Sequence, residues 1–141
     1  MDFTFGKYNG KAIAWVLLED PAYLKWLCES TSRDNEIEFV EYLIEQFNQR
    51  PLQTKCRIID CNSLATHFTL YNSTYTGSYW FCSECDPYHM GALCDTLTIH
   101  SLEHLSLSFL SQFPRMIQEL YYAKGGQQRK TKSSLKKFFN Y

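Results

Sequence analysis

The sequence lacks any long run of hydrophobic residues. Its longest apolar stretch, Ala12 to Leu18, is far shorter than the about 20 residues that a membrane-spanning helix needs. The N-terminal segment also lacks the apolar core of a secretory signal, and its second residue, Asp2, is acidic. We therefore expect a soluble intracellular protein with no membrane partner, in the cytoplasm or, for a eukaryotic or viral protein, in the nucleus.

The signatures of several enzyme classes are missing as well. The six glycines form neither a Walker loop nor a dinucleotide-binding fingerprint. No local signature of Cys-His nucleophilic catalysis is present, and no internal repeat recurs along the chain. We therefore expect a protein that is not an enzyme.

What is present is typical of a globular protein. The chain has 141 residues, of which 45% are hydrophobic and 21% are charged. A chain of this length forms one compact domain or two very small modules, with a core of its own. Aromatic residues are frequent, at 16%.

Acidic residues are absent from one segment, 124–141, which carries six Lys or Arg. Residues 1–50 carry five basic against nine acidic residues, and residues 51–123 carry three against six. A basic tail on an acidic body indicates an arm for nucleic acid or for an acidic partner. The alternative is a solvated terminus that only aids solubility.

Residues 1–53 are predicted to form a small module that opens with a hairpin. Phe3 to Tyr8 alternate in the manner of a short strand, and Asn9-Gly10 marks a tight turn. Ala12 to Leu18 form a first helix. A second helix runs from Pro21 to about Glu29, with Asp20 as N-cap. Its expected apolar face consists of Tyr23, Leu24, Trp26 and Leu27.

A third helix completes this module. Asp34 or Asn35 is its predicted cap, and Arg50-Pro51 ends it. Glutamates occupy the face opposite to its apolar residues. The apolar positions recur at helical spacing, at Ile37, Val40, Leu43, Ile44 and Phe47.

Residues 54–124 are predicted to begin with short strands and to end with two helices. The expected strands are Arg57–Ile59, His67–Tyr71 and Tyr79–Phe81, with a turn over 72–78. The expected helices cover Leu97–Gln112 and the stretch from Pro114 to the pair Gly125-Gly126. We therefore expect an α+β fold, and a basic flexible tail over 125–141 after it in the chain.

Cysteines suggest a metal site. Cys82 and Cys85 form a C-x-x-C pair, and Cys56 and Cys61 form a second pair with four intervening residues. Zinc takes four such ligands in a tetrahedron, and two turns joined by short strands supply them at this spacing. We expect a zinc ribbon whose Zn²⁺ is structural and does no chemistry.

Two alternatives to this ligand set stay open. The cysteines could be thiols of the core, since free cysteine is among the most buried residue types. His67, His89 or Cys94 could replace Cys56 as a ligand. Cys28, on the second predicted helix, is expected to be ordinary core.

The N-terminal module also resembles a known family. Residues 3–29, with the motif FGKYNGKAIAWVLLEDPAYLKWLCE, are similar to the small C-terminal domain behind the nuclease in exodeoxyribonuclease X-like proteins. The resemblance implies association with nucleic-acid processing enzymes, through DNA binding, by a domain that is not itself catalytic. It makes Lys7 and Lys11 candidate phosphate contacts and Tyr8 a candidate stacking residue. From the residues alone, two lysines that flank a glycine turn commonly belong only to a solvated hairpin.

Nuclease activity of that family requires an acidic cluster that begins on a D-x-E strand and holds two metal ions. No predicted strand of this chain carries D-x-E. Residues 56–95, with ATHFTLY, YWFC and CDPYxxGA, resemble a cysteine-bearing extension that accompanies the domain in some small bacterial and phage-type proteins.

The tail resembles a peptide that binds sliding clamps of the PCNA type. The pattern is Q-x-x-aliphatic-x-x-aromatic-aromatic, and this chain supplies Leu135, Phe138 and Phe139 but has Lys132 in place of the glutamine. These three side chains would fill a hydrophobic pocket of a clamp, while Arg129, Lys130 and Lys132 would touch DNA. The alternative is that Phe138 and Phe139 fold back onto the body.

One short motif suggests an enzyme. His100, Glu103 and His104 match H-x-x-E-H, in which two histidines on one helical face bind zinc and the glutamate acts as base. Glu119 is the only acidic residue downstream that could be a third protein ligand. The alternative is an amphipathic helix whose polar face holds two histidines.

Together these features predict a non-enzymatic, zinc-containing adaptor that binds DNA and is linked to DNA replication, repair or processing. Its partners would be DNA and a sliding clamp or a nuclease. The alternative functions are a protein-interaction module that acts on a replication protein, and a zinc hydrolase.

Overall fold

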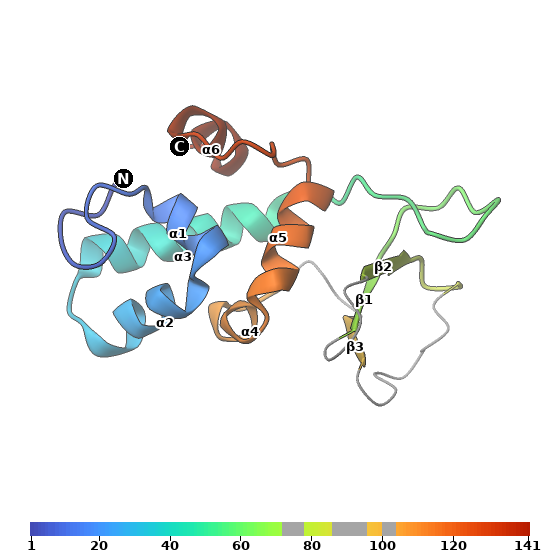
Figure 1. Ribbon diagram of the computed structural model, residues 1–141, viewed down its shortest axis with the longest axis horizontal. Coiled ribbons are helices and arrows are strands. Elements are labelled where there is room, and N and C mark those ends of the chain that lie inside the picture. Colours follow the sequence, from blue (N-terminus) through green and yellow to red (C-terminus); the bar gives the residue numbers. More distant parts are fainter. Residues whose placement is uncertain (72–77, 86–95, 100–103) are drawn as a thin grey trace. The chain divides into compact units, whose positions relative to one another are not determined.

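The computed structural model describes residues 1–71, 78–85, 96–99 and 104–141. The chain forms two compact units (Figure 1): unit 1 is residues 1–50 with 105–141, and unit 2 is residues 51–104. The described part of unit 1 is helical, and that of unit 2 contains a small sheet, so the predicted α+β class is confirmed. No helix in these described ranges is long and apolar enough to cross a membrane.

The first half of unit 1 contains α1 (Ile13–Glu19), α2 (Pro21–Ser30) and α3 (Asp34–Gln49). The side chain of Asp20 caps α2 as predicted, accepting a hydrogen bond from the backbone N–H of Tyr23. The predicted cap of α3 is wrong, because Arg33 takes the N-cap position and Asp34 is the first helical residue. There the carboxylate of Asp34 lies next to the positive end of the helix dipole.

The chain before α1 forms a closed loop. Asp2 and Ala12 make an isolated antiparallel bridge, and the N–H of Gly10 donates to the carbonyl of Phe3 at 2.7 Å. The strand predicted over Phe3–Tyr8 is wrong, because the chain turns at Gly6, whose φ of 67° lies in the left-handed region. The loop therefore projects Lys7 and Tyr8 from a tight turn.

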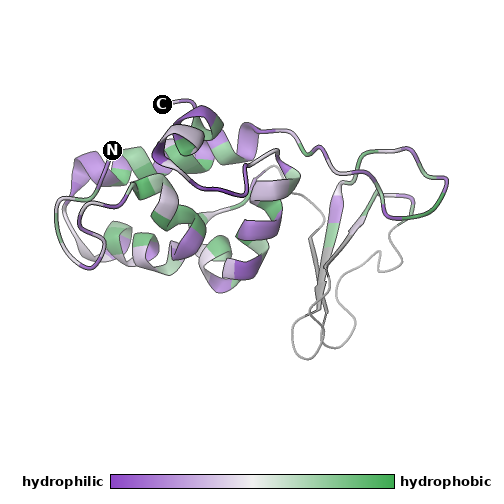
Figure 2. Ribbon diagram, turned by 45° about the horizontal axis from the view of Figure 1, so that its top comes forward, coloured by the Kyte–Doolittle hydropathy of each residue, from purple (hydrophilic) through white to green (hydrophobic). Residues whose placement is uncertain are grey.

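Helix α1 is the centre of unit 1. It packs against α2, α3, α5 and α6, and hydrophobic and hydrophilic residues alternate along the surrounding helices (Figure 2). A helix that is apolar on most of its sides must be covered from several directions. Its buried side chains are Ile13, Ala14, Val16, Leu17 and Leu18.

The second half of unit 1 contains α4 (Leu107–Gln112), α5 (Pro114–Ala123) and α6 (Lys132–Phe139). Helix α5 begins at Pro114 as predicted, α4 packs on α2, and α5 and α6 pack on α1. The chain is thus grouped differently from the predicted domains 1–53, 54–124 and 125–141. The reason is that the apolar faces of α5 and α6 find their core on the N-terminal helices.

The C-terminal segment is folded, whereas the sequence predicted a flexible tail. Thr131 caps α6, and the backbone N–H groups and side-chain oxygens of Thr131 and Ser134 bond reciprocally in a capping box. Leu135, Phe138 and Phe139 are at most 3% exposed. The alternative in which the two phenylalanines fold back onto the body is therefore the one that the structure adopts.

Two basic side chains join α3, α5 and α6. Lys124, only 2% exposed, donates from its ammonium to the carbonyls of Phe47 and Arg50, each at 2.9 Å. The guanidinium of Arg50 donates to the carbonyls of Lys124 and Phe138 and lies over the Phe138 ring. These bonds satisfy carbonyls at the end of α3 and hold α6 in place.

Unit 2 contains β1 (His67–Tyr71), β2 (Ser78–Phe81) and β3 (Thr96–Ile99). The described strands form an antiparallel sheet in the order β2-β1-β3, with His67 opposite Phe81 and Phe68 opposite Ile99. Two of the predicted strands therefore exist. Residues 72–77 of the predicted turn lie outside the described residues.

Two predicted elements of this region are wrong. Among the described residues of the helix expected over Leu97–Gln112, only those of α4 are helical, because Thr96–Ile99 pairs with β1 as an edge strand. The sequence TLTI is rich in β-branched residues, which suits an extended strand. Arg57–Ile59 is not a strand either, since the chain turns there toward Asp60, whose φ is 68°.

Candidate metal centre and nucleic-acid surface

Four cysteines of unit 2 come together from two turns. A bridge between Lys55 and Leu64 closes the first turn, which carries Cys56 and Cys61. The turn after β2 carries Cys82 and Cys85. The N–H of Arg57 donates to the carbonyl of Trp80 at 2.8 Å, so backbone hydrogen bonding holds the first turn against β2.

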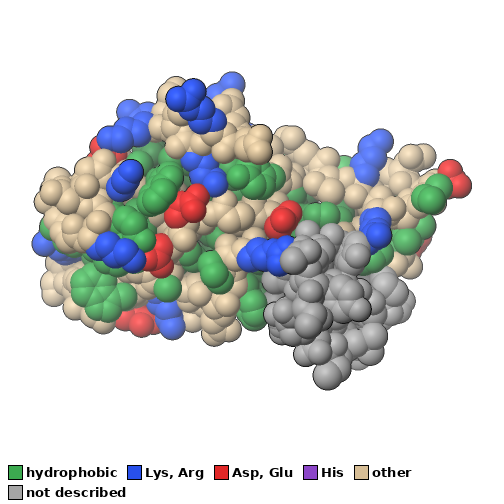
Figure 3. Space-filling view, viewed as in Figure 1, with side chains coloured by type: hydrophobic (Ala, Val, Ile, Leu, Met, Phe, Trp, Pro, Cys, Tyr) green, Lys and Arg blue, Asp and Glu red, His purple; other side chains and the backbone are tan. Residues whose placement is uncertain are grey.

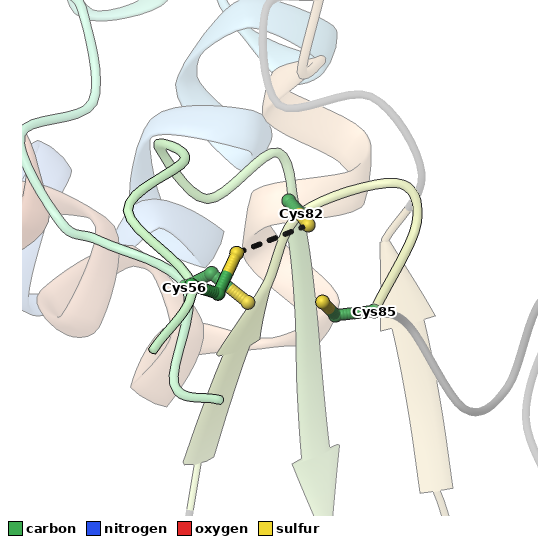
Figure 4. A group of neighbouring side chains, drawn as sticks. Cys56, Cys82 and Cys85 are labelled. Atoms are coloured by element: carbon green, nitrogen blue, oxygen red, sulfur yellow. Dashed lines mark hydrogen bonds between the residues drawn. The ribbon is translucent and has the colours of Figure 1, made fainter. Parts of the chain in front are cut away.

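The sulfur atoms of these four residues, the cysteine cluster, all lie within 4.8 Å of one another. Figure 4 shows the side chains of Cys56, Cys82 and Cys85 directed toward one another. The Sγ atoms of Cys61 and Cys82 are 3.9 Å apart, far longer than the about 2.05 Å of a disulfide. Four sulfurs bound tetrahedrally at about 2.3 Å from one zinc ion would be about 3.8 Å apart.

The thiols of the cluster do not titrate alike. Burial raises the pKa of Cys56, but hydrogen bonds from the backbone N–H groups of Ile58 and Cys82 and from neighbouring thiols outweigh it and lower that pKa to about 7. The hydrogen bond with Cys82, burial and the nearby Cys61 and Cys56 raise the pKa of Cys85 to about 12. Full ionisation of the cluster therefore needs a nearby positive charge, which a metal ion supplies.

The cluster can hold a metal ion, as the C-x4-C and C-x2-C spacing predicts. Two of its members, Cys56 and Cys82, are buried in one apolar group with Phe81. His67 is not in the group, and the alternative ligands His89 and Cys94 lie outside the described residues. Cys28 is half-buried on α2 of unit 1, where burial raises its pKa.

His104, the described residue of the H-x-x-E-H motif, does not lie on a helix. Ile99 ends β3 and α4 begins at Leu107, so His104 lies before the helix. His104 is also exposed. His100 and Glu103 lie outside the described residues. Glu119, the suggested third ligand, lies on α5 of unit 1.

Asp20, the N-cap of α2, organises the predicted nucleic-acid contacts of the N-terminal loop. Its Oδ2 accepts hydrogen bonds from the Tyr8 hydroxyl at 2.7 Å and from the Lys7 ammonium at 3.2 Å. Burial opposes ionisation of Asp20, but these bonds and the N–H of Tyr23 lower its pKa. Lys7 remains 66% exposed, so a phosphate can reach its ammonium. Lys11 is exposed as well and lies over the Trp15 ring at 5.2 Å.

Sequence reasoning missed an aromatic row beside this loop. Trp15, Tyr8, Tyr23 and Trp26 contact each other in that order, with ring centroids 6.1, 4.9 and 5.4 Å apart. Trp26 was expected in the apolar face of α2 but is 48% exposed. The signal was available, because the buried positions of α2 are Pro21, Leu24 and Leu27, and Trp26 falls outside that spacing.

The basic residues of the C-terminal segment differ in their exposure and in their ion-pair partners. Arg129 is exposed, whereas the Lys130 side chain is only 13% exposed and its ammonium pairs with Glu19 at 2.9 Å. Lys132 pairs with Asp2, which lowers the pKa of that carboxyl. Two of these three predicted DNA contacts are thus paired with acidic groups of unit 1, but the Lys132 side chain, like that of Lys7, stays largely exposed, at 62%.

The residues expected to enter a clamp are core residues instead. Phe138 packs against the rings of Tyr121 and Phe47, and Phe139 stacks with Phe47. The prediction of an exposed apolar plug is wrong in this structure because α3 and α5 already bury it.

Comparison with known proteins agrees with the N-terminal resemblance. Residues 3–30, which contain most of the N-terminal loop and the whole of α1 and α2, match the family model "Exodeoxyribonuclease X-like C-terminal". The predicted resemblance is confirmed. Exodeoxyribonuclease 10 from Escherichia coli strain K12 is 46% identical over 44 residues, which are 29% of this chain and 20% of that protein. The same values hold for Exodeoxyribonuclease 10 from Escherichia coli O6:H1.

This chain therefore spans about a fifth of the length of these relatives. No solved structure matches it. The spacing D-x-E does occur once, as Asp34-Asn35-Glu36, but on the first turn of α3 and not on a strand. Glu36 there pairs with Arg33.

Proposed function

We propose that this protein is a non-enzymatic, zinc-containing adaptor that binds DNA and takes part in DNA replication, repair or processing. The observation that carries the proposal is the match of residues 3–30 to the exodeoxyribonuclease X-like C-terminal family. The relatives are exodeoxyribonucleases, which are enzymes that act on DNA. In this proposal the matched segment binds DNA, and Lys7, Tyr8 and Lys11 contact its backbone.

Zinc is the metal that we propose for the cysteine cluster. Four thiolates in a tetrahedral arrangement form a closed structural site for Zn²⁺, without an open position for a reacting water. The residues present fit that ion, because each of the four sulfurs lies near the others and no other ligand is needed. The role of the ion is to join the two turns of unit 2.

The alternative clamp-binding function receives no support from α6, because its three apolar side chains are buried in unit 1. A hydrolase built on H-x-x-E-H receives none from His104, which is not helical. The adaptor function therefore remains the one that the described residues favour.

The test combines metal analysis with DNA binding by the full chain. We expect one zinc per chain after purification without added metal, and binding of DNA that weakens as salt rises. The double variant Lys7→Ala/Lys11→Ala should bind about tenfold more weakly at low salt, because two phosphate contacts are removed. Lys137→Ala, which removes an exposed charge from α6, serves as the control. Absence of binding to any DNA at low salt would refute the proposed function.

A further inference from the structure

We propose that the aromatic row of unit 1 is a stacking platform for the bases of single-stranded nucleic acid, with Trp26 as its exposed end. This inference rests on the proposed function and names the form of nucleic acid that the site takes. The row begins at Trp15, which is half-buried beneath Lys11, and ends at Trp26 on the outer side of α2.

The row is continuous, and its members come from three local elements. Tyr8 lies in the loop, Trp15 on α1, and Tyr23 and Trp26 on α2. The Tyr8 ring meets both Trp15 and Tyr23 edge-on, while Tyr23 and Trp26 are tilted by 41°. The bond from the Tyr8 hydroxyl to Asp20 fixes the centre of the row to the N-cap of α2. Such fixed rings lose little conformational entropy when a flat ligand stacks on them.

Exposure separates this row from the core. Trp26 is 48% exposed, although burying an aromatic side chain is strongly favourable. The core of unit 1 does not need it, because Leu24 and Leu27 already fill the buried face of α2. A large apolar side chain left in water next to other aromatic rings marks a binding surface.

The basic side chains near the row indicate which class of ligand it can bind. The ammonium of Lys7 lies over the Tyr8 ring at 4.9 Å, that of Lys11 over Trp15, and the guanidinium of Arg33 over Phe5 at 3.4 Å. These positive charges would repel a cationic ligand, such as those that bind in aromatic cages. A nucleic-acid strand carries both flat base rings and anionic phosphates, so it can contact the aromatic rings and the cations of this surface at the same time. Figure 3 shows apolar, basic and acidic side chains close together on the face of unit 1 that it draws.

Single strands fit this surface better than duplexes do. In a duplex the faces of the bases are stacked on each other, so only phosphates and groove edges are accessible. In a single strand each base can leave its neighbours and stack on a protein ring. Since ring faces accept every base, we expect little sequence preference. With two cations at the row, Lys7 and Lys11, the logarithm of affinity should fall with the logarithm of salt with a slope of roughly −1.4.

The test compares three probes on the full-length protein: an oligothymidine of roughly 16 nucleotides, an abasic strand of the same length, and a blunt duplex. Fluorescence anisotropy of the labelled probes gives the affinities. We expect the oligothymidine to bind most tightly. Trp26→Ala should weaken its binding about tenfold or more, but should change binding of the abasic strand by less than about twofold. Trp26→Phe, which keeps an aromatic face, should retain most of the affinity.

The matched control is Tyr122→Ala, since Tyr122 is an exposed aromatic residue of α5 outside the row. Circular dichroism of each variant verifies that unit 1 is folded, and Trp26→Phe gives a second, milder variant. Equal binding of oligothymidine and abasic strand, or tighter binding of duplex, would overturn the stacking platform while the proposed function stands. An unchanged affinity in Trp26→Ala would overturn it as well. Failure of all three probes to bind would instead refute the proposed function itself.

Discussion

The two units are stabilised in different ways. In unit 1 the central helix α1 is covered by the apolar faces of the helices that pack on it. The buried ammonium of Lys124 in this unit is hydrogen-bonded to backbone carbonyls. Among the residues of unit 2 whose burial the structure describes, Cys56 and Cys82 of the cysteine cluster lie with Phe81 in one buried group. Small zinc domains obtain much of their folding free energy from the metal. We therefore expect that unit 1 is stabilised by burial and unit 2 by its cysteine cluster.

The largest effect is expected from the cysteine cluster. The double variant Cys82→Ser/Cys85→Ser removes two ligands, and structural zinc contributes roughly 10–16 kcal/mol in small zinc domains. We expect zinc to be lost and unit 2 to unfold while the helices of unit 1 remain. Zinc content together with calorimetry, in which one of two transitions disappears, measures this. Cys28→Ser is the control, because Cys28 lies outside the cluster.

The second effect concerns the core of unit 1. Phe139 is completely buried against Phe47, so Phe139→Ala should lower the free energy of unfolding of unit 1 by about 3–5 kcal/mol. The zinc content should not change. Denaturant unfolding followed by circular dichroism measures the loss, with Lys137→Ala as an exposed control on the same helix. A loss below about 0.5 kcal/mol would mean that α6 is not docked.

A smaller effect is expected at Lys124. In Lys124→Met the apolar stem is kept, but the carbonyls of Phe47 and Arg50 lose their buried donor. Leaving buried acceptors without that donor should cost about 1–3 kcal/mol in the stability of unit 1. The same unfolding assay measures it. Stability equal to that of the wild type would contradict the role given to this ammonium in joining α3 and α5.

The smallest effect depends on pH. The folded-state pKa of Asp20 lies below its unfolded value, so its contribution to stability is present above the unfolded value of about 3.9. That contribution is lost as the pH falls through the folded-state pKa. The exposed Lys7 partner limits it to about 1 kcal/mol or less. Unfolding of unit 1 measured between about pH 2 and pH 6 should show this loss, and Asp20→Asn should remove that part of the pH dependence.

Local signals in the sequence predicted the elements that depend on local chemistry. The cap at Asp20, the start of α5 at Pro114 and the apolar spacing of α3 follow from short-range rules, and all three are confirmed. The spacing of Cys82 and Cys85 likewise indicated the metal site, since both lie in one turn.

Elements that depend on distant partners could not be predicted in this way. The helical pattern over Leu97–Gln112 gave no sign that Thr96–Ile99 would pair with β1. The sequence of α6 is compatible with a free peptide, and only the surface provided by Phe47 and Tyr121 buries its phenylalanines. The aromatic row is a different case: it was missed because Trp26 was assigned to the apolar face of α2, although it falls outside the spacing of Pro21, Leu24 and Leu27.

The most direct test of the difference between the units is hydrogen exchange, measured by mass spectrometry on the full chain before and after removal of metal with a chelator. We predict that peptides from residues 51–71 and 78–85 lose their protection when the metal is removed. Peptides from α1, α3 and α5 should keep theirs. Unchanged protection in residues 51–85 would contradict a metal-stabilised unit 2. Loss of protection in both units at once would contradict a unit 1 stabilised by its own core.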